Sequence, residues 1–360
     1  MDRIGVGIIG SQFIADIHAE CFRRASGAEV RAVASLNEAH AREFAARHGI
    51  AAWHVGHEDL LARDDIDLIT VCAPNDVHHR ITVDAARAGK HVICEKPLAM
   101  TLTQADEMIA ACQQAGVKLM YAEELCFAPK YVRAKQLADE GALGRITLVK
   151  QSEKHDGPHA PWFWDMKRAG GGVTFDMGCH AIEFFRWVLN KPRVIDVYAN
   201  MGTYVHGDRT EGDDNALIIV NFENGATGLA EESWTKKGGM DDRAEIHGSL
   251  GVTYANLLQG NSLTTYSDVG YGYAVEKAGS TRGWSFTIYE EIWNYGFVQE
   301  MQHFVDCVLN DTQPLETGED GRAVLEVLFA AYESAGTGRK VQLPFTPPEG
   351  KRPIELWLGR

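Results

Sequence analysis

Short apolar runs alternate with amphipathic stretches over the first 123 residues of the chain. The apolar, β-branched runs predict buried strands at 4–9, 29–35, 51–53, 66–73, 92–94 and 117–122. The stretches between them have helical periodicity and predict helices at 13–24, 38–48, 78–88 and 102–114. Strands that alternate with helices through short connections predict a doubly wound parallel sheet.

The pattern changes at Glu123, so we divide the chain into a first domain, 1–123, and a second, 124–360. The second domain begins with a helix, a strand and a buried helical run, predicted at 130–140, 146–153 and 173–189. Runs separated by polar turns then predict strands at 194–204, 214–222, 226–235, 243–247, 251–256 and 263–266. Two helices, 294–309 and 318–337, follow. We expect an α/β protein whose second domain has a mostly antiparallel sheet.

Charge and cysteine content narrow the class of partner. The formal net charge is -15, which disfavours a nucleic-acid or anionic-membrane surface. Seven scattered cysteines form no CxxC pair, which indicates reduced thiols and a cytoplasmic location. We see no signal-peptide pattern and no apolar run of membrane-spanning length.

The turn after the first strand is a candidate phosphate loop. Residues 10–15 read Gly-Ser-Gln-Phe-Ile-Ala, a GxGxxA frame with Gln12 in place of the second glycine. Gly10 can make the tight turn, whereas the side chain of Gln12 would crowd a pyrophosphate unless it binds the phosphate itself. The predicted cofactor contacts here are Gly10, Gln12, Phe13 and Ile14. The alternative is a plain strand–turn–helix unit.

The end of the second strand normally selects between NAD and NADP. An acid there binds the ribose 2′-hydroxyl, and an arginine accepts a 2′-phosphate. This chain has neither, but Ser35 or Asn37 could bond a ribose hydroxyl. We therefore predict NAD, with NADP as the alternative through Arg42.

The fourth strand ends in a rigid polar turn. Pro74 and Asn75 stand at its carboxyl end, where they can reach a cofactor or simply form a turn. His78 begins the next helix, where we assign it a structural role and also count it among the cofactor-facing candidates.

The run 88–97, Ala-Gly-Lys-His-Val-Ile-Cys-Glu-Lys-Pro, places a charged lysine at the end of a buried strand. Pro97 cannot extend the ladder and disfavours helix at Lys96. Ligands of open α/β sheets bind at this edge, so Glu95 and Lys96 are candidate site residues. The alternative is a surface lysine in an ordinary turn.

The loop 155–165 contains aromatic side chains and histidines. Tryptophan faces pack on the apolar faces of sugar rings, which makes His155, Trp162 and Trp164 candidate substrate contacts. The alternative is a loop held in place by aromatic packing.

Three glycines, 170–172, precede the buried helical run 173–189. Asp176 and His180 lie four residues apart on one helix face, with Glu183 at the next turn. They could be a helix cap and a core histidine, but the glycines permit close approach of another group, which favours a site. The metal ligands this region could offer are His155, His159, Asp176 and His180, and we predict no metal.

With these runs together, the chain resembles the glucose–fructose oxidoreductase, inositol dehydrogenase and MocA (Gfo/Idh/MocA) family over nearly its whole length. The resemblance is carried by AGKHVxxEKP at 88–97, GGGxxxDxGxH at 170–180, and the late helix with Glu-Asp-Gly at 319–321 and Ala-Tyr-Glu-Ser at 331–334. It implies an N-terminal Rossmann domain and a second domain for substrate binding and oligomer contacts. The family's catalytic lysine, aspartate and histidine fall on Lys96, Asp176 and His180.

The resemblance implies an NAD(P)-dependent oxidoreductase acting on a secondary hydroxyl of a sugar, glycoside or cyclitol. Some relatives instead cleave glycosides with bound NAD, by transient oxidation, elimination, hydration and re-reduction. Others are non-catalytic sugar sensors, but the presence of Lys96, Asp176 and His180 argues against that class here. A homodimer or homotetramer is the expected assembly.

Overall fold

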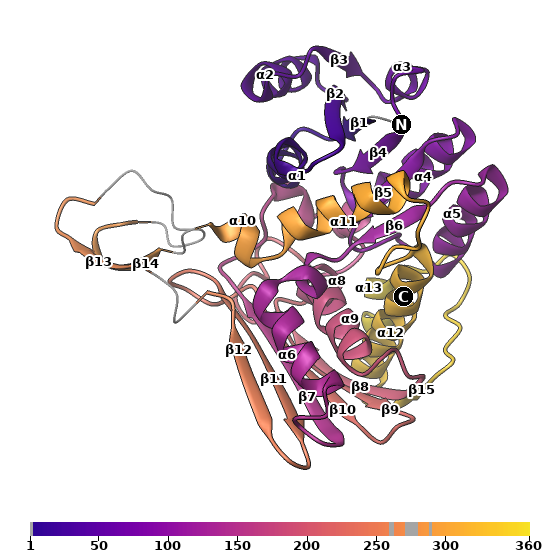
Figure 1. Cartoon of the computed structure of the whole chain (residues 1–360). Coiled ribbons are helices and arrows are strands. Elements are labelled where there is room, and N and C mark those ends of the chain that lie inside the picture. The colour runs from indigo at the N-terminus through magenta and orange to yellow at the C-terminus, as the bar shows by residue number, and fades with distance from the viewer. Residues whose placement is uncertain (1–2, 259–262, 271–279, 288–289) are drawn as a thin grey trace. The chain divides into compact units, whose positions relative to one another are not determined.

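The computed structural model describes residues 3–258, 263–270, 280–287 and 290–360 (Figure 1). The chain divides into two compact units, Met1–Glu124 with Gly296–Leu325, and Leu125–Tyr295 with Glu326–Arg360. The sequence-based division placed everything after residue 123 in one domain. The structure instead packs α11 (Phe297–Leu309) against α1 (Phe13–Arg24) within the first unit.

The first unit contains a six-stranded parallel sheet with strand order β3-β2-β1-β4-β5-β6 within the described residues. Its strands are β1 (Ile4–Ile9), β2 (Ala28–Ser35), β3 (Ala52–Val55), β4 (Leu68–Val71), β5 (His91–Glu95) and β6 (Leu119–Ala122). The predicted doubly wound sheet is confirmed. The order reverses between β1 and β4, and the carboxyl ends of strands at such a reversal are where dinucleotides bind.

Helices and short turns connect these strands. They are α1, α2 (Glu38–His48), α3 (Glu58–Leu61), η1 (Asn75–Val77), α4 (His78–Arg87) and α5 (Leu102–Ala115), and α11 joins the unit from later in the chain. Capping side chains fix two of the starts, because Asn37 and Thr101 each accept a hydrogen bond from a backbone N–H three residues on. Gly49 and Gly116 end the same helices in left-handed conformations.

The second unit contains a seven-stranded sheet with the order β12-β11-β7-β10-β9-β8-β15. Its strands are β7 (Ile146–Lys154), β8 (Val194–Gly202), β9 (Asn215–Phe222), β10 (Thr227–Ser233), β11 (Asp241–Gly248), β12 (Val252–Asn256) and β15 (Val341–Gln342). Neighbours are antiparallel except β7 and β10, which run parallel. The predicted mostly antiparallel sheet is confirmed. A separate hairpin is formed by β13 (Leu263–Ser267) and β14 (Gly283–Thr287).

Helices cover one face of this sheet (Figure 1). They include α6 (Pro129–Asp139), which packs on β11 and β12, and α9 (Gly178–Val188), which packs on β7 and β10. The single helix predicted over 173–189 is two helices, α8 (Val173–Asp176) and α9, joined at Met177. Gly228 of β10 makes close packing possible, because a Cβ there would lie 2.3 Å from the Phe185 ring.

The remaining elements belong to the second unit, except that two of them begin in the first unit and end in the second. The remaining elements are η2 (Glu124–Phe127), η3 (Pro161–Trp164), α7 (Met166–Ala169), α10 (Glu291–Asn294), α12 (Gly318–Thr337) and α13 (Pro353–Trp357). The two that begin in the first unit are η2 and α12. The helix predicted over 294–309 begins at Phe297, after the separate turn α10. Within the described residues, we find no helix with the length and apolar character to span a bilayer.

Candidate active site

The candidate phosphate loop joins β1 to α1. Gly10 has a φ of 131°, and a Cβ there would lie 2.1 Å from the carbonyl oxygen of Cys72, so the turn requires glycine. Gln12 is the N-cap residue of α1 and provides no side-chain cap. Phe13 and Ile14 then form the first turn of a twelve-residue helix. A helix start without a side-chain cap at this edge fits a pyrophosphate, which would accept hydrogen bonds from the first backbone amides.

The end of β2 lies beside this loop. The hydroxyl of Ser11 donates to that of Ser35 at 3.0 Å. Asn37 caps α2, since its Oδ1 accepts the backbone N–H of His40 at 3.1 Å. The cap leaves the amide nitrogen of Asn37 as the group that could donate to a ribose hydroxyl. The ribose contact of Ser35 and Asn37 stays a prediction.

The turn after β4 is tied to the turn after β5 by a buried histidine. One ring nitrogen of His78 lies 2.8 Å from the carbonyl oxygen of Ala73, and the other lies 3.0 Å from that of Pro97. Burial lowers the pKa of His78 below its usual value. This geometry gives His78 the structural role of holding two strand ends together. Pro74 and Asn75 lie in the same turn, where Pro74 precedes η1 and Asn75 is buried.

Lys96 follows β5 directly and is anchored through Glu95. The backbone N–H of Lys96 donates to Glu95 Oε2 at 3.2 Å. Glu95 Oε1 lies 2.8 Å from His18 Nε2, and His18 Nδ1 lies 2.7 Å from Thr70 Oγ1. This buried chain of contacts crosses from α1 through β4 to β5. It fixes the backbone from which the Lys96 side chain extends.

The Glu95–His18 pair is charged. Burial raises the pKa of Glu95, but the hydrogen bond and charge of His18 outweigh it and hold that pKa below its usual value. Burial lowers the pKa of His18, but Cys72 and Glu95 outweigh it and raise that pKa well above its usual value. The strand end that carries Lys96 therefore rests on a buried carboxylate–imidazolium pair.

In the second unit, the three glycines before α8 admit another part of the same chain. A Cβ on Gly172 would lie 2.0 Å from the carbonyl oxygen of Asp213. The Asp213 carboxylate accepts the N–H of Gly172 at 3.1 Å and that of Thr174 at 2.8 Å, and it accepts the hydroxyl of Tyr332 at 2.7 Å. The close approach that the glycines predicted is therefore made by Asp213 and Tyr332. It fixes the start of the segment that carries Asp176 and His180.

Asp176 ends α8 and His180 lies in the first turn of α9, and both side chains are buried. The indole N–H of Trp234 donates to Asp176 Oδ2 at 3.3 Å. Trp234 immediately follows β10, so this bond ties Asp176 to the end of the sheet. Glu183, on the next turn, forms an ion pair with Arg186, which makes it part of the framework.

The aromatic loop converges on the same tryptophan. Trp164 lies 5.4 Å from Trp234 and 5.0 Å from His206, between ring centroids. Trp162 stacks on Phe163 at 3.8 Å, and Phe163 meets Trp234 edge-on at 6.4 Å. Trp164 of the loop and Asp176 of α8 are thus joined through Trp234, which is fully buried and holds the two in place.

His155 follows β7 and is buried, with Nδ1 2.7 Å from the carbonyl oxygen of Gly157. The rings of His155 and His159 lie 5.0 Å apart. The N–H of His155 also donates to the carbonyl oxygen of Ser233 at 2.9 Å, next to Trp234. The structure therefore brings His155, Trp164 and Asp176 to the common end of β7 and β10.

Sequence reasoning missed His18, Trp234 and His206. Trp234 carried a usable signal, since it lies near the end of the strand predicted over 226–235, where ligands bind. His18 and His206 carried none, because their partners lie 77 and 28 residues away in the chain.

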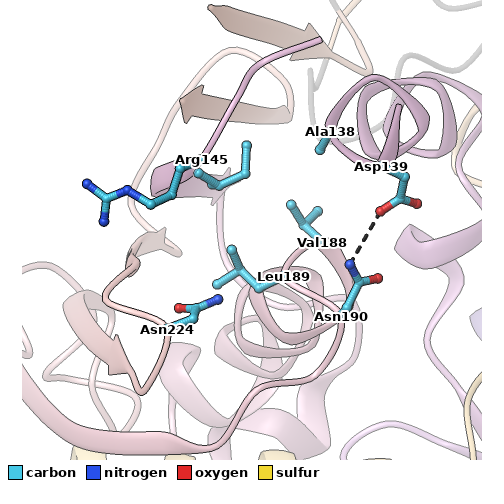
Figure 2. A pocket seen from close by; sticks show the side chains of 8 residues that line it. Ala138, Asp139, Arg145, Val188, Leu189, Asn190 and Asn224 are labelled. Atoms are coloured by element: carbon cyan, nitrogen blue, oxygen red, sulfur yellow. Dashed lines mark hydrogen bonds between the residues drawn. The ribbon is translucent and has the colours of Figure 1, made fainter. Parts of the chain in front are cut away.

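A separate pocket lies at the far end of α9 and contains none of the predicted residues. Figure 2 shows Asp139 and Asn190 at this pocket, linked by a 3.4 Å hydrogen bond. The lining residues are Ala138, Asp139, Arg145, Ile146, Val188, Leu189, Asn190 and Asn224. Val188 ends the helix that begins beside Asp176. Eleven residues at about 1.5 Å each separate the two ends, so this pocket is distinct from the candidate site.

Comparison with known proteins identifies the class. Residues 4–123 match the oxidoreductase family with an NAD-binding Rossmann fold, and residues 131–253 match the GFO/IDH/MocA C-terminal domain. The chain belongs to the Gfo/Idh/MocA family, and it is an NAD-binding oxidoreductase.

Particular relatives extend over almost the whole chain. The 1,5-anhydro-D-fructose reductase of Ensifer adhaerens is 30% identical over 94% of this chain and 98% of its own length. The myo-inositol 2-dehydrogenase of Thermotoga maritima is 26% identical over 94% and 98%. The crystal structure of GenD2 from gentamicin A biosynthesis, in complex with NAD, is 32% identical, with a TM-score of 0.90 and coverage of 96% and 97%.

Proposed function

We propose that this protein transfers a hydride between nicotinamide and a secondary hydroxyl of a sugar, glycoside or cyclitol. The observation that carries the proposal is the indole bond from Trp234 to Asp176, beside Trp164. It joins a carboxylate to aromatic faces of the kind that hold sugar rings. The relatives' names, an anhydrofructose reductase and an inositol dehydrogenase, support the same substrate class.

When bound, NAD accepts or returns the hydride. The residues that would hold it are Gly10, Gln12, Phe13, Ile14, Ser35, Asn37, Pro74, Asn75, His78, Glu95 and Lys96. The uncapped start of α1 fits the pyrophosphate, and Ser35 and Asn37 fit a ribose hydroxyl. The lack of an arginine immediately beside Asn37 favours NAD over NADP, whose 2′-phosphate needs a cation.

The chain's own residues then accept the proton and stabilise the developing charge. His180 removes the hydroxyl proton, since an imidazole has a pKa near working pH. Asp176, fixed by Trp234, orients the substrate by accepting a neighbouring hydroxyl. Lys96, fixed on the Glu95–His18 pair, stabilises the negative charge that develops on the substrate oxygen. His155, Trp162 and Trp164 hold the ring.

Substitution of Lys96 and His180 tests the proposal. We expect His180→Ala to bind NAD as the wild type does and Lys96→Met to retain NAD binding through the other contacts, measured by calorimetric titration. Each should lose hydride transfer by at least about a hundredfold, measured as NADH formation with a panel of cyclitols, free sugars and glycosides. Near-normal turnover in either variant would contradict the assigned roles.

The same panel separates net oxidation from glycoside cleavage. Accumulation of NADH with a glycoside means a dehydrogenase. Release of the aglycone without NADH means the redox-neutral route, in which oxidation, elimination, hydration and re-reduction follow one another. Bound NAD with no conversion of any substrate means a non-catalytic sensor and would overturn the proposal.

A further inference from the structure

Three acidic side chains lie in a row across neighbouring strands of the second unit's sheet. Glu232 of β10 is directly opposite Glu153 of β7, and Glu153 is directly opposite Asp242 of β11. Residues in register project on the same face, and adjacent strands are about 4.8 Å apart. All three side chains are buried, with Glu232 1% exposed and Asp242 fully inaccessible. We call these three residues the acid row.

The acid row lies on the helix-covered face, beside the candidate site. Gly228 faces Phe185 of α9, and alternation along β10 places Glu232 and Trp234 on that same face. Tyr131 of α6 donates its hydroxyl to Asp242, which confirms the face independently. Trp234 follows Glu232 by two residues and holds Asp176. The acid row is therefore next to the residues proposed to bind substrate.

The acidic side chains on the two faces of this sheet differ in whether they have a charged partner. On the opposite face, Glu231 pairs with Lys154 at 2.6 Å and Glu245 pairs with Lys150 at 3.4 Å. Glu232 forms no ion pair within the described residues, and neither of its carboxyl oxygens has a hydrogen-bond partner there. A buried polar group without a partner destabilises a fold, so its presence next to a site indicates that the partner is a ligand.

The chemistry of the acid row selects a cation with directional hydrogen bonds. A divalent metal needs several oxygens around one point, but the three carboxyl groups do not offer one atom each within 4.8 Å of one another. An ammonium group has three donors that diverge from one nitrogen, and it suits acceptors spread along a row.

We propose that Glu232, with Glu153 and Asp242, receives a protonated amino group of the substrate, so that the enzyme acts on an amino sugar or aminocyclitol. The inference rests on the proposed function and narrows its substrate class. In the complex, Glu232 accepts the hydrogen bonds that no described residue supplies, while Trp164 packs on the ring.

Matched pairs of compounds test the proposal on the whole enzyme with NAD. D-Glucosamine and 3-amino-3-deoxy-D-glucose are each compared with D-glucose, and scyllo-inosamine is compared with scyllo-inositol. We expect kcat/KM for the amino member of at least one pair to exceed that of its hydroxyl partner by about tenfold or more, as a charge-assisted hydrogen bond provides. In Glu232→Gln, that ratio should fall by about tenfold or more.

The matched control is Glu231→Gln, on the same strand but the opposite face, which should keep the wild-type ratio. Far-ultraviolet circular dichroism and an NAD titration establish whether Glu232→Gln is folded. If it is not folded, the ratio of kcat/KM between amino and hydroxyl members, measured on the wild-type enzyme, tests the proposal alone. Hydroxyl members oxidised as well as or better than amino members would overturn this inference and leave the proposed function standing. No NADH from any compound, with NAD binding intact, would overturn both.

Discussion

Glu95 and Glu232 are the same residue type in the same kind of place, yet their pKa values shift in opposite directions. Each lies at or near the carboxyl end of a buried strand, and each is less than 10% exposed, at 6% and 1%. His18 lies 2.8 Å from Glu95 and holds its pKa below the usual value. Burial, and after it the Asp242 carboxylate, raise the pKa of Glu232 well above the usual value.

The difference shows that the presence of a cationic partner, and not burial alone, sets the direction in which the pKa of a buried acid shifts in this protein. Glu300 of α11 supports this reading within the first unit. It is fully buried, and burial, followed by the charges of Glu124 and Glu95, raises its pKa well above the usual value. Of Glu95 and Glu300, the glutamate with the histidine partner is the one whose pKa is lowered. In the first unit, His18 pairs with the glutamate that supports Lys96. In the second unit, Glu232 has no such partner within the described residues.

The largest expected effect on the free energy of unfolding comes from removing one partner of the Glu95–His18 pair. Glu95→Met leaves His18 buried beside an apolar side chain, and removing one partner of a buried ion pair costs about 3–5 kcal/mol. We expect the free energy of unfolding to fall by that amount, measured by urea denaturation at neutral pH. An unchanged stability would mean that the pair contributes nothing, and the comparison with Glu232 would fail.

The same substitution at the other site should have the opposite sign. Glu232→Met removes a buried carboxyl group without a partner and keeps a side chain of similar length. Because such a group costs about 1–3 kcal/mol, we expect the free energy of unfolding to rise by that amount. Urea denaturation of the substrate-free enzyme measures it. A loss as large as that of Glu95→Met would show that Glu232 has a stabilising partner after all.

These two sites also show what the sequence could predict. Apolar periodicity and turn residues identified both sheets and most helix positions, because a strand buried on both faces or on one face leaves a local pattern. The run at 88–97 also placed Lys96 at a strand end, because Pro97 stops the strand. The break at Met177, between α8 and α9, was missed.

The partners of buried polar groups could not be predicted. His18 meets Glu95 across 77 residues, and Trp234 meets Asp176 across 58. Neither distance along the chain leaves a local signal, because the contact depends on strand order. The acid row was hidden for the same reason. Glu153, Glu232 and Asp242 become neighbours only when β7 lies between β10 and β11.

The pH dependence of stability sharpens the contrast further. A lowered folded pKa means that the contribution of Glu95 is fully present above its unfolded pKa of about 4.3 and is lost as the pH falls through the folded pKa. A raised folded pKa means that the contribution of Glu232 is present below about 4.3 and is lost as the pH rises through the folded pKa. The folded pKa of His18 is also raised, so its contribution to stability is present below its unfolded pKa of about 6.5 and is lost as the pH rises through the folded pKa.

We therefore expect the two methionine variants to change opposite limbs of the pH profile. Compared with the wild type, Glu95→Met should lose less stability on the acid side, and Glu232→Met should lose less as the pH rises. The change is at most about 1.4 kcal/mol per pH unit for each group. Urea denaturation at a series of pH values measures both slopes. Parallel profiles for the two variants would contradict the assigned charge states.

The smallest effect is expected at an ion pair on the surface of the same helix that carries His18. Glu20 of α1 accepts hydrogen bonds from Arg23 at 2.6 and 2.9 Å, as short as the Glu95–His18 contact. The side chain of Arg23 is 69% exposed, however, so water screens the pair and solvates either partner alone. Glu20→Met should therefore change the free energy of unfolding by less than about 1 kcal/mol, with the same urea measurement. If Glu20→Met costs as much as Glu95→Met, bond length rather than burial sets the value of a charged pair in this protein. The contrast between Glu95 and Glu232 would then need another explanation.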